Sequence, residues 1–344
     1  MKYKLIVIGQ IENKKTGLGK AINDFILHYN KKYGDNSLYQ LDITKNTKFI
    51  SNCFKILAVN CDKFYFTPSG SLFGNLRDCV YLFLMMLRGK KIITHFHNSS
   101  FKSIVESNTI LNWINRCLYK RVDKIIILGN KQKAMFSSMQ INEDKFRIIR
   151  NGIDENIFIS EEMLIKKHSK KPINIIYFSN MIPEKGYQTV LSVAKLMRCN
   201  KDFHFYFSGV FFDPSLKDKF LQEIENMDNV TYINGVYGLE KAEVLAEMNI
   251  LLFPSKYKDE TLPISMLEAI ANGLYIIVSD VGVISEVVNK ETTSLLSSID
   301  SYMLANIIEE KSKILNELNY NIIYYKSNYK NSNILEHLVN TVEE

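Results

Sequence analysis

Short apolar runs alternate with amphipathic segments along the chain, and this alternation limits the fold more than any other feature. KLIVIG (4–9) is a strand-like run, and the helix-like KAINDFILHYNKKYG (20–34) follows it. The alternation continues to about residue 150 and starts again with PINIIYFSN (172–180). Strands that alternate with helices form parallel sheets covered by helices on both faces. The sequence therefore predicts an α/β protein built from two doubly wound, Rossmann-like domains.

The length of 344 residues also suggests two domains. A polar and charged segment, residues 155–171, separates the two strand–helix series. We expect an N-terminal domain over residues 1–160, a C-terminal domain over 161–320, and a helical tail over 321–344 that packs back toward the N-terminal domain.

The net charge of +6 is divided unevenly along the chain. Residues 1–160 carry 25 Lys and Arg against 12 Asp and Glu (+13), whereas residues 161–344 carry 18 against 25 (−7). A basic half predicts an anionic partner such as a phospholipid surface, a lipid phosphate or a nucleic acid, and compositional drift in a Lys-rich chain is the alternative. Nucleic-acid binding would call for aromatic residues on a basic face, but Phe and Tyr fall mainly on predicted strands, so we expect no nucleic-acid partner.

Targeting and membrane-spanning signals are weak. The longest apolar run, VYLFLMML (80–87), has eight residues, far fewer than the 18 or more of a membrane span. The N-terminus lacks the apolar core of a signal peptide. The five cysteines include no CxxC pair, so neither a zinc site nor a disulfide framework is predicted. We expect a cytoplasmic protein, with peripheral attachment to the inner face of the membrane as an option.

Two glutamates eight positions apart stand out in KYKDETLPISMLEAIANG (256–273). Glu260 lies before a predicted helix and Glu268 lies inside it. Thr261 is a good N-cap, Pro263 suits the first turn, and a glycine at 273 suits the end. The N-terminus of such a helix is a ready site for phosphate. The pattern indicates half of a nucleotide-sugar site, and a surface helix with two solvated carboxylates is the alternative.

Two further features of the first half carry a ligand hypothesis. Gly17 and Gly19 form a glycine loop before a helix, where backbone N–H groups can approach a phosphate. The loop lacks the third glycine of a dinucleotide fingerprint, so an NAD site is disfavoured and a plain tight turn is the alternative. His95 and His97 are two apart near a strand's end and share a face. No third metal ligand is evident nearby, so His97 is a candidate ligand-binding residue and a hydrogen-bonded strand-end histidine is the alternative.

The order of several segments is similar to that of the family 4 glycosyltransferases, which have the GT-B fold. The resemblance covers nearly the whole chain and is strongest between residues 147 and 288. It is carried by RIIRNGIDENIF (147–158), IIYFSNMIPEKG (175–186), FYFSG (205–209), NVTYINGVYG (229–238), DETLPISMLEAIANG (259–273) and SDVGVISEVV (279–288).

This resemblance implies two Rossmann-like domains facing a cleft, an N-terminal one for the acceptor and a C-terminal one for the donor. It implies a retaining transfer of a sugar from a UDP- or GDP-sugar to a hydroxyl of a glycan acceptor. Because the basic first half of the chain suggests a lipid phosphate as partner, we expect this glycan to be linked to a lipid pyrophosphate. The setting would be assembly of a cell-surface polysaccharide such as O-antigen, capsule or exopolysaccharide. No metal and no other cofactor is implied. A soluble acceptor and a non-catalytic nucleotide-sugar-binding protein are the alternatives.

The resemblance also assigns roles. The catalytic candidates are Glu260 at the donor sugar, Lys185 at the leaving diphosphate and His97 on the acceptor side. Glu268 would bind the ribose hydroxyls. The remaining donor-binding candidates are Gly17, Gly19, Asn180, Tyr237, Thr261, Leu262 and Ile264.

One position departs from the family pattern. The family usually has Arg where this chain has Asn180, and the neutral amide cannot make the bidentate ionic contact of an arginine. Either another cation replaces it, with Arg150 the nearest unassigned candidate in sequence, or diphosphate binding relies on Lys185 and the helix N-terminus.

Overall fold

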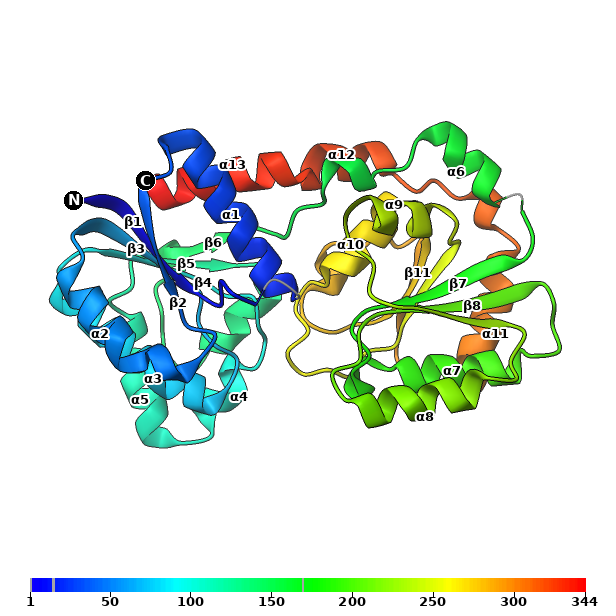
Figure 1. Cartoon of the computed structure of the whole chain (residues 1–344), viewed down its shortest axis with the longest axis horizontal. Coiled ribbons are helices and arrows are strands. Elements are labelled where there is room, and N and C mark those ends of the chain that lie inside the picture. The colour runs from blue at the N-terminus through cyan, green and yellow to red at the C-terminus, as the bar shows by residue number, and fades with distance from the viewer. Residues whose placement is uncertain (1, 14–15, 169) are drawn as a thin grey trace. The chain divides into compact units, whose positions relative to one another are not determined.

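The computed structural model describes residues 2–13, 16–168 and 170–344, which form two compact units. The first unit comprises Met1–Gly152, Lys258–Leu262 and Asn331–Glu344, and the second comprises Ile153–Tyr257 and Pro263–Lys330. Each unit is built on a six-stranded parallel sheet of described residues with helices on both faces (Figure 1). The predicted fold class of two doubly wound domains is therefore confirmed.

The sheet of the first unit has the strand order β2-β1-β3-β4-β5-β6. Its strands are β1 (Tyr3–Gly9), β2 (Leu38–Asp42), β3 (Cys61–Phe66), β4 (Lys91–His95), β5 (Lys124–Ile127) and β6 (Phe146–Ile148). Its helices are α1 (Gly17–Tyr33), α2 (Phe49–Ala58), α3 (Leu72–Leu87), α4 (Phe101–Glu106), α5 (Thr109–Tyr119) and α13 (Asn331–Glu343). Short 3-10 turns occupy Asn46–Lys48, Asn130–Phe136 and Glu143–Lys145.

Strand periodicity divides the core of the first unit into two layers. On β1, Ile6 and Ile8 belong to the layer under α2, α3 and α5, whereas Leu5 and Val7 belong to the layer under α1 and α13. Successive side chains of a strand point to opposite faces, so a strand buried on both faces is apolar throughout. Figure 1 shows α1 and α13 on one side of this sheet and α2, α3 and α5 on the other.

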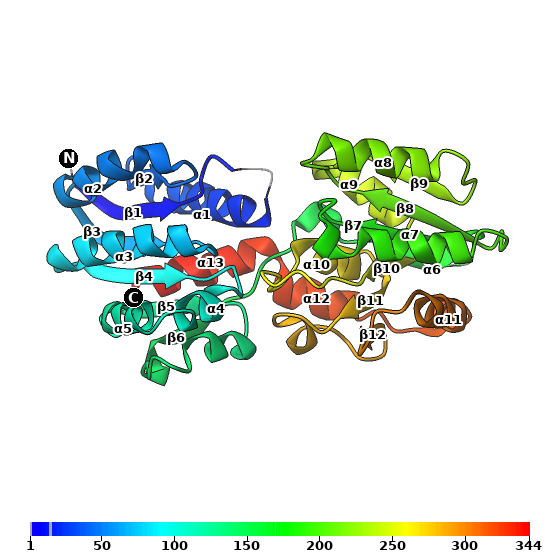
Figure 2. The same ribbon diagram turned by 90° about the horizontal axis from the view of Figure 1, so that it is seen from below.

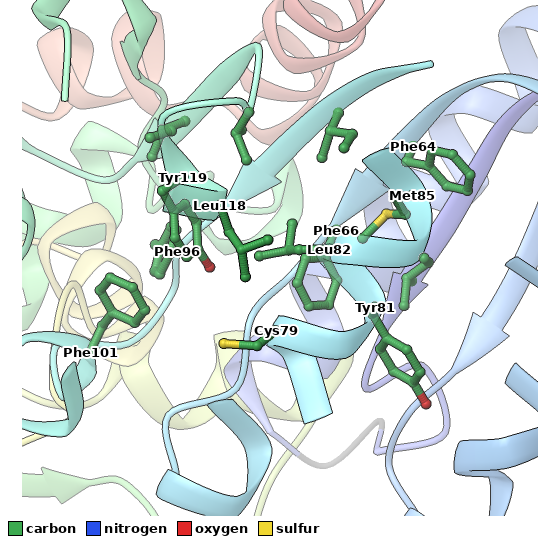
Figure 3. Close-up of a cluster of buried hydrophobic side chains, with 14 of the residues drawn as sticks. Phe64, Phe66, Cys79, Tyr81, Leu82, Met85, Phe96, Phe101, Leu118 and Tyr119 are labelled. Carbon is green, nitrogen blue, oxygen red and sulfur yellow. The ribbon is translucent and has the colours of Figure 1, made fainter. Parts of the chain in front are cut away.

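The layer under α3 is dense in aromatic side chains. Phe64 and Phe66 of β3 face Leu82 and Met85 of α3 (Figure 3), and all four are almost fully buried. Phe96 packs edge-on against neighbouring rings, with its ring centroid 5.0 Å from that of Phe101. This packing fixes which face of α3 points inward and which points to solvent.

The second unit has the strand order β12-β11-β10-β7-β8-β9. Its strands are β7 (Ile173–Phe178), β8 (Phe203–Ser208), β9 (Val230–Ile233), β10 (Ile250–Phe253), β11 (Tyr275–Ser279) and β12 (Thr293–Leu296). Its helices are α6 (Glu161–His168), α7 (Tyr187–Leu196), α8 (Pro214–Ile224), α9 (Gly238–Ala246), α10 (Ile264–Ala271), α11 (Ser301–Ser312) and α12 (Ile322–Tyr329). Short 3-10 turns occupy Glu155–Ile157, Pro183–Lys185, Ile284–Glu286 and Leu315–Glu317.

The division between the units differs from the predicted boundary near residue 160. The first unit ends at Gly152, and the short segment Lys258–Leu262 returns to it from the second half of the chain. The tail is also divided, because α12 belongs to the second unit and α13 to the first. There α13 packs along α1, with Lys32 Nζ 2.6 Å from Glu336 Oε1. Such returns are set by tertiary contacts, which local composition does not reveal.

None of the described helices combines the length and the apolar character that a membrane crossing requires.

Candidate functional site

The carboxyl ends of β7 and β10 lie side by side in the second unit, where the strand order changes direction. After β7 the chain runs outward along the sheet through β8 to β9, and it then returns to β10 on the other side of β7. Open α/β sheets bind ligands at this switch point, outside the carboxyl ends of the strands. The loops that follow β7 and β10 are therefore the first places to look for a site.

Lys185 lies at the switch point, at the end of the 3-10 turn that follows β7. Its Nζ is 3.3 Å from Ser179 Oγ and 5.3 Å from the ring centroid of Tyr257, which belongs to the loop after β10. The two loops are also joined through backbone, since Lys256 N–H donates to the Glu184 carbonyl at 2.7 Å. A lysine ammonium is thus held where the two central loops of the sheet meet.

A glycine allows these loops to approach so closely. Gly186 has a φ of +89°, and a Cβ added there would lie 2.4 Å from the Pro254 carbonyl oxygen. Both the backbone conformation and the contact exclude a larger side chain. The loop conformation that places Lys185 therefore requires glycine at position 186.

Glu268 is buried inside α10 and forms an ion pair. Its side chain is 2% exposed, and its Oε1 lies 2.6 Å from Lys241 Nζ, which is itself only 12% exposed. A charge is stable in the interior only when it is paired and hydrogen-bonded, and Lys241 is such a partner for this carboxylate. Sequence reasoning missed Lys241, because GLEKAEVLAEM resembles an ordinary solvated helix.

The N-terminus of α10 differs from the prediction at its first residues. The helix begins at Ile264, and Pro263 is its N-cap, with φ −61° and ψ 122°. The expected N-cap, Thr261, is wrong: its Oγ1 donates instead to the His97 carbonyl at 3.1 Å. Leu262 lies before the helix and its carbonyl accepts from Asn151 Nδ2 at 2.8 Å, so of the two predicted amide donors only Ile264 is in the first turn. The predicted stop is confirmed, because Gly273 follows the helix with a φ of +64°.

Asn180 and Tyr237 lie in two different loops of the second unit, Asn180 after β7 and Tyr237 between β9 and α9. The Asn180 carbonyl accepts from the Tyr177 hydroxyl at 3.0 Å and from Ile182 N–H at 2.8 Å, which shapes the loop after β7. Tyr237 is the N-cap of α9 and is 54% exposed. Arg150, the cation considered in place of the usual arginine, belongs to the first unit. The structure thus gathers Asn180, Lys185, Tyr237, Ile264 and Glu268 in one unit.

The other predicted residues gather in the first unit. There the segment Lys258–Leu262 is held against the loop after β4, because Ser99 Oγ donates to the Glu260 carbonyl at 3.1 Å and lies 3.0 Å from Thr261 Oγ1. These bonds place the backbone of Glu260 beside the loop that carries His97. The sequence did not predict this grouping, since serine and threonine contacts across 162 positions leave no local signal.

The rings of His97 and His95 lie side by side, with centroids 4.0 Å apart and planes tilted by 39°, so the predicted shared face is confirmed. The Tyr65 hydroxyl lies 2.6 Å from His95 Nδ1. Burial lowers the pKa of His97 to about 4, and burial together with the neighbouring His97 holds the pKa of His95 well below its ordinary value. Both rings are therefore neutral near pH 7, when each imidazole has one N–H donor and one acceptor nitrogen.

Gly17 and Gly19 do not form the predicted loop. Both lie in the first turn of α1, and Gly19 N–H donates to Thr16 Oγ1 at 3.1 Å, so this amide is already used as part of the helix cap. Residues 14–15, shortly before these glycines, lie outside the described residues. In the described part of the chain, no group of three His, Cys, Asp or Glu side chains is arranged to hold a metal ion.

Comparison with known proteins places this geometry in context. Residues 159–326 match the family described as Glycosyl transferases group 1. An uncharacterized 41.2 kDa protein from the cps region of Klebsiella pneumoniae is 27% identical over 195 residues, which cover 55% of this chain and 51% of that protein. The chain thus matches about half the length of that relative. An uncharacterized glycosyltransferase of Methanocaldococcus jannaschii is 23% identical over 327 residues, covering 88% of this chain and 78% of that protein.

Solved structures resemble the chain over its whole length. HepE of Anabaena in complex with UDP superposes with a TM-score of 0.76 at 13% identity, covering 99% of both chains. The same protein in complex with UDP-glucose superposes with a TM-score of 0.72. At this identity the likeness shows the fold alone.

Proposed function

Since residues 159–326 belong to the glycosyl transferases group 1 family and the whole chain has the GT-B fold, we propose that this protein is a retaining glycosyltransferase. It takes a sugar from a UDP- or GDP-sugar and attaches it to a hydroxyl of a glycan acceptor. The single observation that supports this most is that one unit holds both a lysine at the switch point, Lys185, and a buried glutamate in α10, Glu268, that is paired with Lys241.

Lys185 binds the donor diphosphate in this proposal. Its ammonium lies where the loops after β7 and β10 meet, and the nearby α10 adds the positive end of its dipole through the amide of Ile264. As the bond to the sugar breaks, negative charge builds up on the leaving diphosphate. A cation fixed beforehand at that position lowers the barrier more than it strengthens ground-state binding. The proposal assigns the leaving group to Lys185 and the helix, and it includes no metal or other cofactor.

Glu268 binds the ribose hydroxyls of the nucleotide. An ionised carboxylate only accepts hydrogen bonds, which suits a vicinal diol that donates two. Because Lys241 occupies Oε1, the pair can hold the carboxylate in one orientation while its acceptor sites meet the ribose. Lys241 is therefore a positioning residue in this proposal. Tyr237, exposed at the start of α9, flanks the base.

Glu260 and His97 serve the sugar and the acceptor. Glu260 meets the hydroxyls of the donor sugar and stabilises the positive charge of an oxocarbenium-like transition state. His97 is neutral near pH 7, so it orients a hydroxyl by hydrogen bonding rather than by charge. The bonds from Ser99 and Thr261 keep the backbone of these two residues together.

The acceptor is proposed to be a glycan on a lipid pyrophosphate, extended during assembly of a cell-surface polysaccharide. The basic first half of the chain supports this, and so does the relative from the Klebsiella cps region. The proposed location is the cytoplasm, at the inner face of the membrane.

A donor panel tests the proposal. The purified chain is heated with UDP-glucose, other UDP-sugars, GDP-sugars and NADH in turn, and slow release of free sugar from each nucleotide sugar is followed. We expect stabilisation and hydrolysis with one class of nucleotide sugar. Stabilisation without hydrolysis or transfer would leave a non-catalytic binding protein, and stabilisation by NADH alone would contradict the proposal.

A further inference from the structure

The outer face of the first unit carries an unusual set of side chains. In α3 the exposed residues are all large and apolar: Leu72, Phe73, Leu76, Val80, Phe83 and Leu87. Their spacing of one, three or four positions puts them on one stripe of a helix, opposite the face that packs on β3. A solvated helix normally has charged residues on this side, whereas the exposed side of α3 is apolar.

The two neighbouring helices extend this stripe into a surface. Figure 2 shows α2 and α5 on either side of α3. The exposed apolar residues of α2 are Ile50, Phe54 and Leu57, and those of α5 are Ile110 and Trp113. We call these five residues and the six of α3 the apolar face. A contiguous surface of this kind on a folded protein marks an interaction site.

Charges around the apolar face have one sign. Residues 49–58, 72–91 and 109–121, which cover the three helices and the turns after α3 and α5, contain eight Lys or Arg and one acidic residue. That residue, Asp78, is buried and paired with Arg77 at 2.8 Å. Among the described residues, the charged groups of Lys55, Lys90, Lys120 and Arg121 form no ion pair and donate no hydrogen bond, although the Lys120 carbonyl accepts from Lys145 Nζ. Their charge is therefore available to an anionic surface.

We propose that the apolar face docks on an anionic phospholipid membrane. Apolar side chains would enter the boundary between headgroups and acyl chains while the surrounding lysines and arginines meet anionic headgroups. Trp113, 65% exposed and the only tryptophan of the chain, has the amphipathic ring that favours this boundary. A second copy of the chain fits less well, because a symmetric interface would place the same cations opposite one another without acidic partners.

The apolar face also leads to the acceptor side of the unit. Its N-terminal end, Leu72 and Phe73, directly follows the loop after β3. That loop is joined to the loop after β4, since Asn98 Nδ2 donates to the Pro68 carbonyl at 3.1 Å and Ser100 Oγ donates to the Gly70 carbonyl at 2.8 Å. The loop after β4 carries His97. This part rests on the proposed function: a lipid-linked acceptor can keep its lipid in the membrane beside Phe73 while its glycan reaches His97.

Trp113 itself reports the docking. Its fluorescence is measured while the full chain is titrated with vesicles of phosphatidylcholine containing phosphatidylglycerol, and with vesicles of phosphatidylcholine alone. We expect a blue shift with the anionic vesicles that requires more lipid as salt is raised. An absent shift, or an equal, salt-independent shift with both vesicles, would overturn the proposal. A shift that grows with protein concentration in the absence of lipid would instead indicate a second copy on the face, and would also overturn it.

Variants localise the surface. The double variant Phe73→Ser/Phe83→Ser removes two side chains that are 79% and 53% exposed, so it should fold normally, and thermal unfolding checks this. We expect it to need at least tenfold more lipid for the same shift. The matched control, Ile165→Ser/Ile323→Ser, changes side chains that are 74% and 70% exposed in the second unit, and should bind like the wild type. Equal binding by both double variants would overturn the assignment.

Charge variants and nucleotide binding complete the test. Lys55→Glu/Lys120→Glu should weaken binding to anionic vesicles severalfold and reduce its salt dependence, whereas Lys219→Glu on α8 should not. The face variants should keep the thermal stabilisation by UDP-sugar. If they do and no protein binds vesicles, membrane docking is overturned while the proposed function stands. If the wild type does not bind UDP-sugar, the proposed function is overturned while membrane docking stands.

Discussion

α3 and α7 each cover a parallel sheet of their own unit, yet their solvent faces are opposite in character. Each helix packs its buried side on a parallel sheet. The exposed residues of α3 are all large and apolar, whereas those of α7 are Gln188, Ser192, Lys195 and Leu196. The fold depends on the inward face, so it tolerates either outward face. The outward face is therefore free to differ between the two units.

The carboxyl edges of the two sheets differ in the same way. The second unit holds a lysine at the switch point and a buried Lys241–Glu268 ion pair. The first unit places two adjacent, neutral histidines and the backbone of Glu260 there. Charged groups suit a nucleotide diphosphate, and neutral ones suit a glycan hydroxyl.

Loss of the switch-point lysine should have the largest effect on the rate of transfer. Lys185→Ala removes the cation proposed to stabilise the leaving diphosphate, and we expect transfer to fall tenfold or more, about 1.4 kcal/mol or above in activation free energy. Steady-state transfer by the folded variant measures this. Lys219→Ala, an exposed lysine of the same unit, is the control. Wild-type rates from Lys185→Ala would remove the diphosphate assignment.

The Lys241–Glu268 ion pair should be the most sensitive to pH. Lys241→Met leaves a buried carboxylate without its cation and should lower the free energy of unfolding by about 3 kcal/mol near pH 7. In this variant Glu268 can avoid the penalty by binding a proton, so its folded-state pKa rises above the unfolded value. The variant should then recover stability as the pH falls through that raised pKa, and urea unfolding at several pH values measures it.

The control for this prediction is an exposed pair. Lys195 Nζ lies 2.5 Å from Glu223 Oε2, and the two side chains are 47% and 36% exposed. Lys195→Met should therefore change stability by less than about 1 kcal/mol, without recovery on acidification. Equal losses from the two variants would mean that burial does not distinguish the pairs.

The close approach of the loops in the second unit should be sensitive to one methyl group. Gly186→Ala adds a Cβ 2.4 Å from the Pro254 carbonyl oxygen at a positive φ, and we expect a loss of about 3 kcal/mol in stability together with reduced transfer. Gly89→Ala, at φ +59° with nothing within 4 Å, should cost only about 1 kcal/mol. Chemical denaturation measures both, and similar losses would show that the contact does not constrain the loop.

Buried histidines should make both units sensitive to acid. Burial lowers the pKa of His97 and of His168 to about 4, so the unfolded chain binds more protons than the folded one between that value and the ordinary value of about 6.5. Stability should fall as the pH drops through this window, by at most about 1.4 kcal/mol per pH unit for each histidine. Asp78 acts in the opposite sense, because burial raises its pKa to about 6.

Substitution separates these contributions. His97→Gln and His168→Gln should each flatten the loss of unfolding free energy between about pH 6.5 and pH 4, whereas His337→Gln, on an exposed position of α13, should not. Unfolding by urea at stepped pH gives the slopes. Unchanged slopes in both buried variants would show that other groups cause the acid sensitivity.

Local sequence pattern was enough to predict the sheets, because apolar runs and amphipathic segments directly record burial. It also placed Glu260 before α10 and Glu268 within it. It could not predict that Thr261 bonds to the His97 carbonyl, since a threonine before a helix has the composition of an N-cap in either case. Lys241 was missed for a similar reason: its partner is 27 positions away on another helix. The role of the residue that replaces the usual arginine, Asn180, stays a prediction.

The apolar face was likewise only partly predictable from the sequence. The sequence suggested an anionic membrane through the charge of the first half and its Arg- and Lys-flanked apolar helices. It could not tell which apolar residues of α3 were core, because Leu82 and Phe83 look alike until the packing of the helix separates them.

The most direct test of this division between the units is a crossed binding experiment. UDP-sugar binding by calorimetry and anionic-vesicle binding by Trp113 fluorescence are both measured for Lys185→Ala and for Phe73→Ser/Phe83→Ser. We predict that the first variant loses at least tenfold in UDP-sugar affinity, about 1.4 kcal/mol, and binds vesicles normally, while the second does the reverse. Variants that each impair both kinds of binding, or neither, would contradict the account.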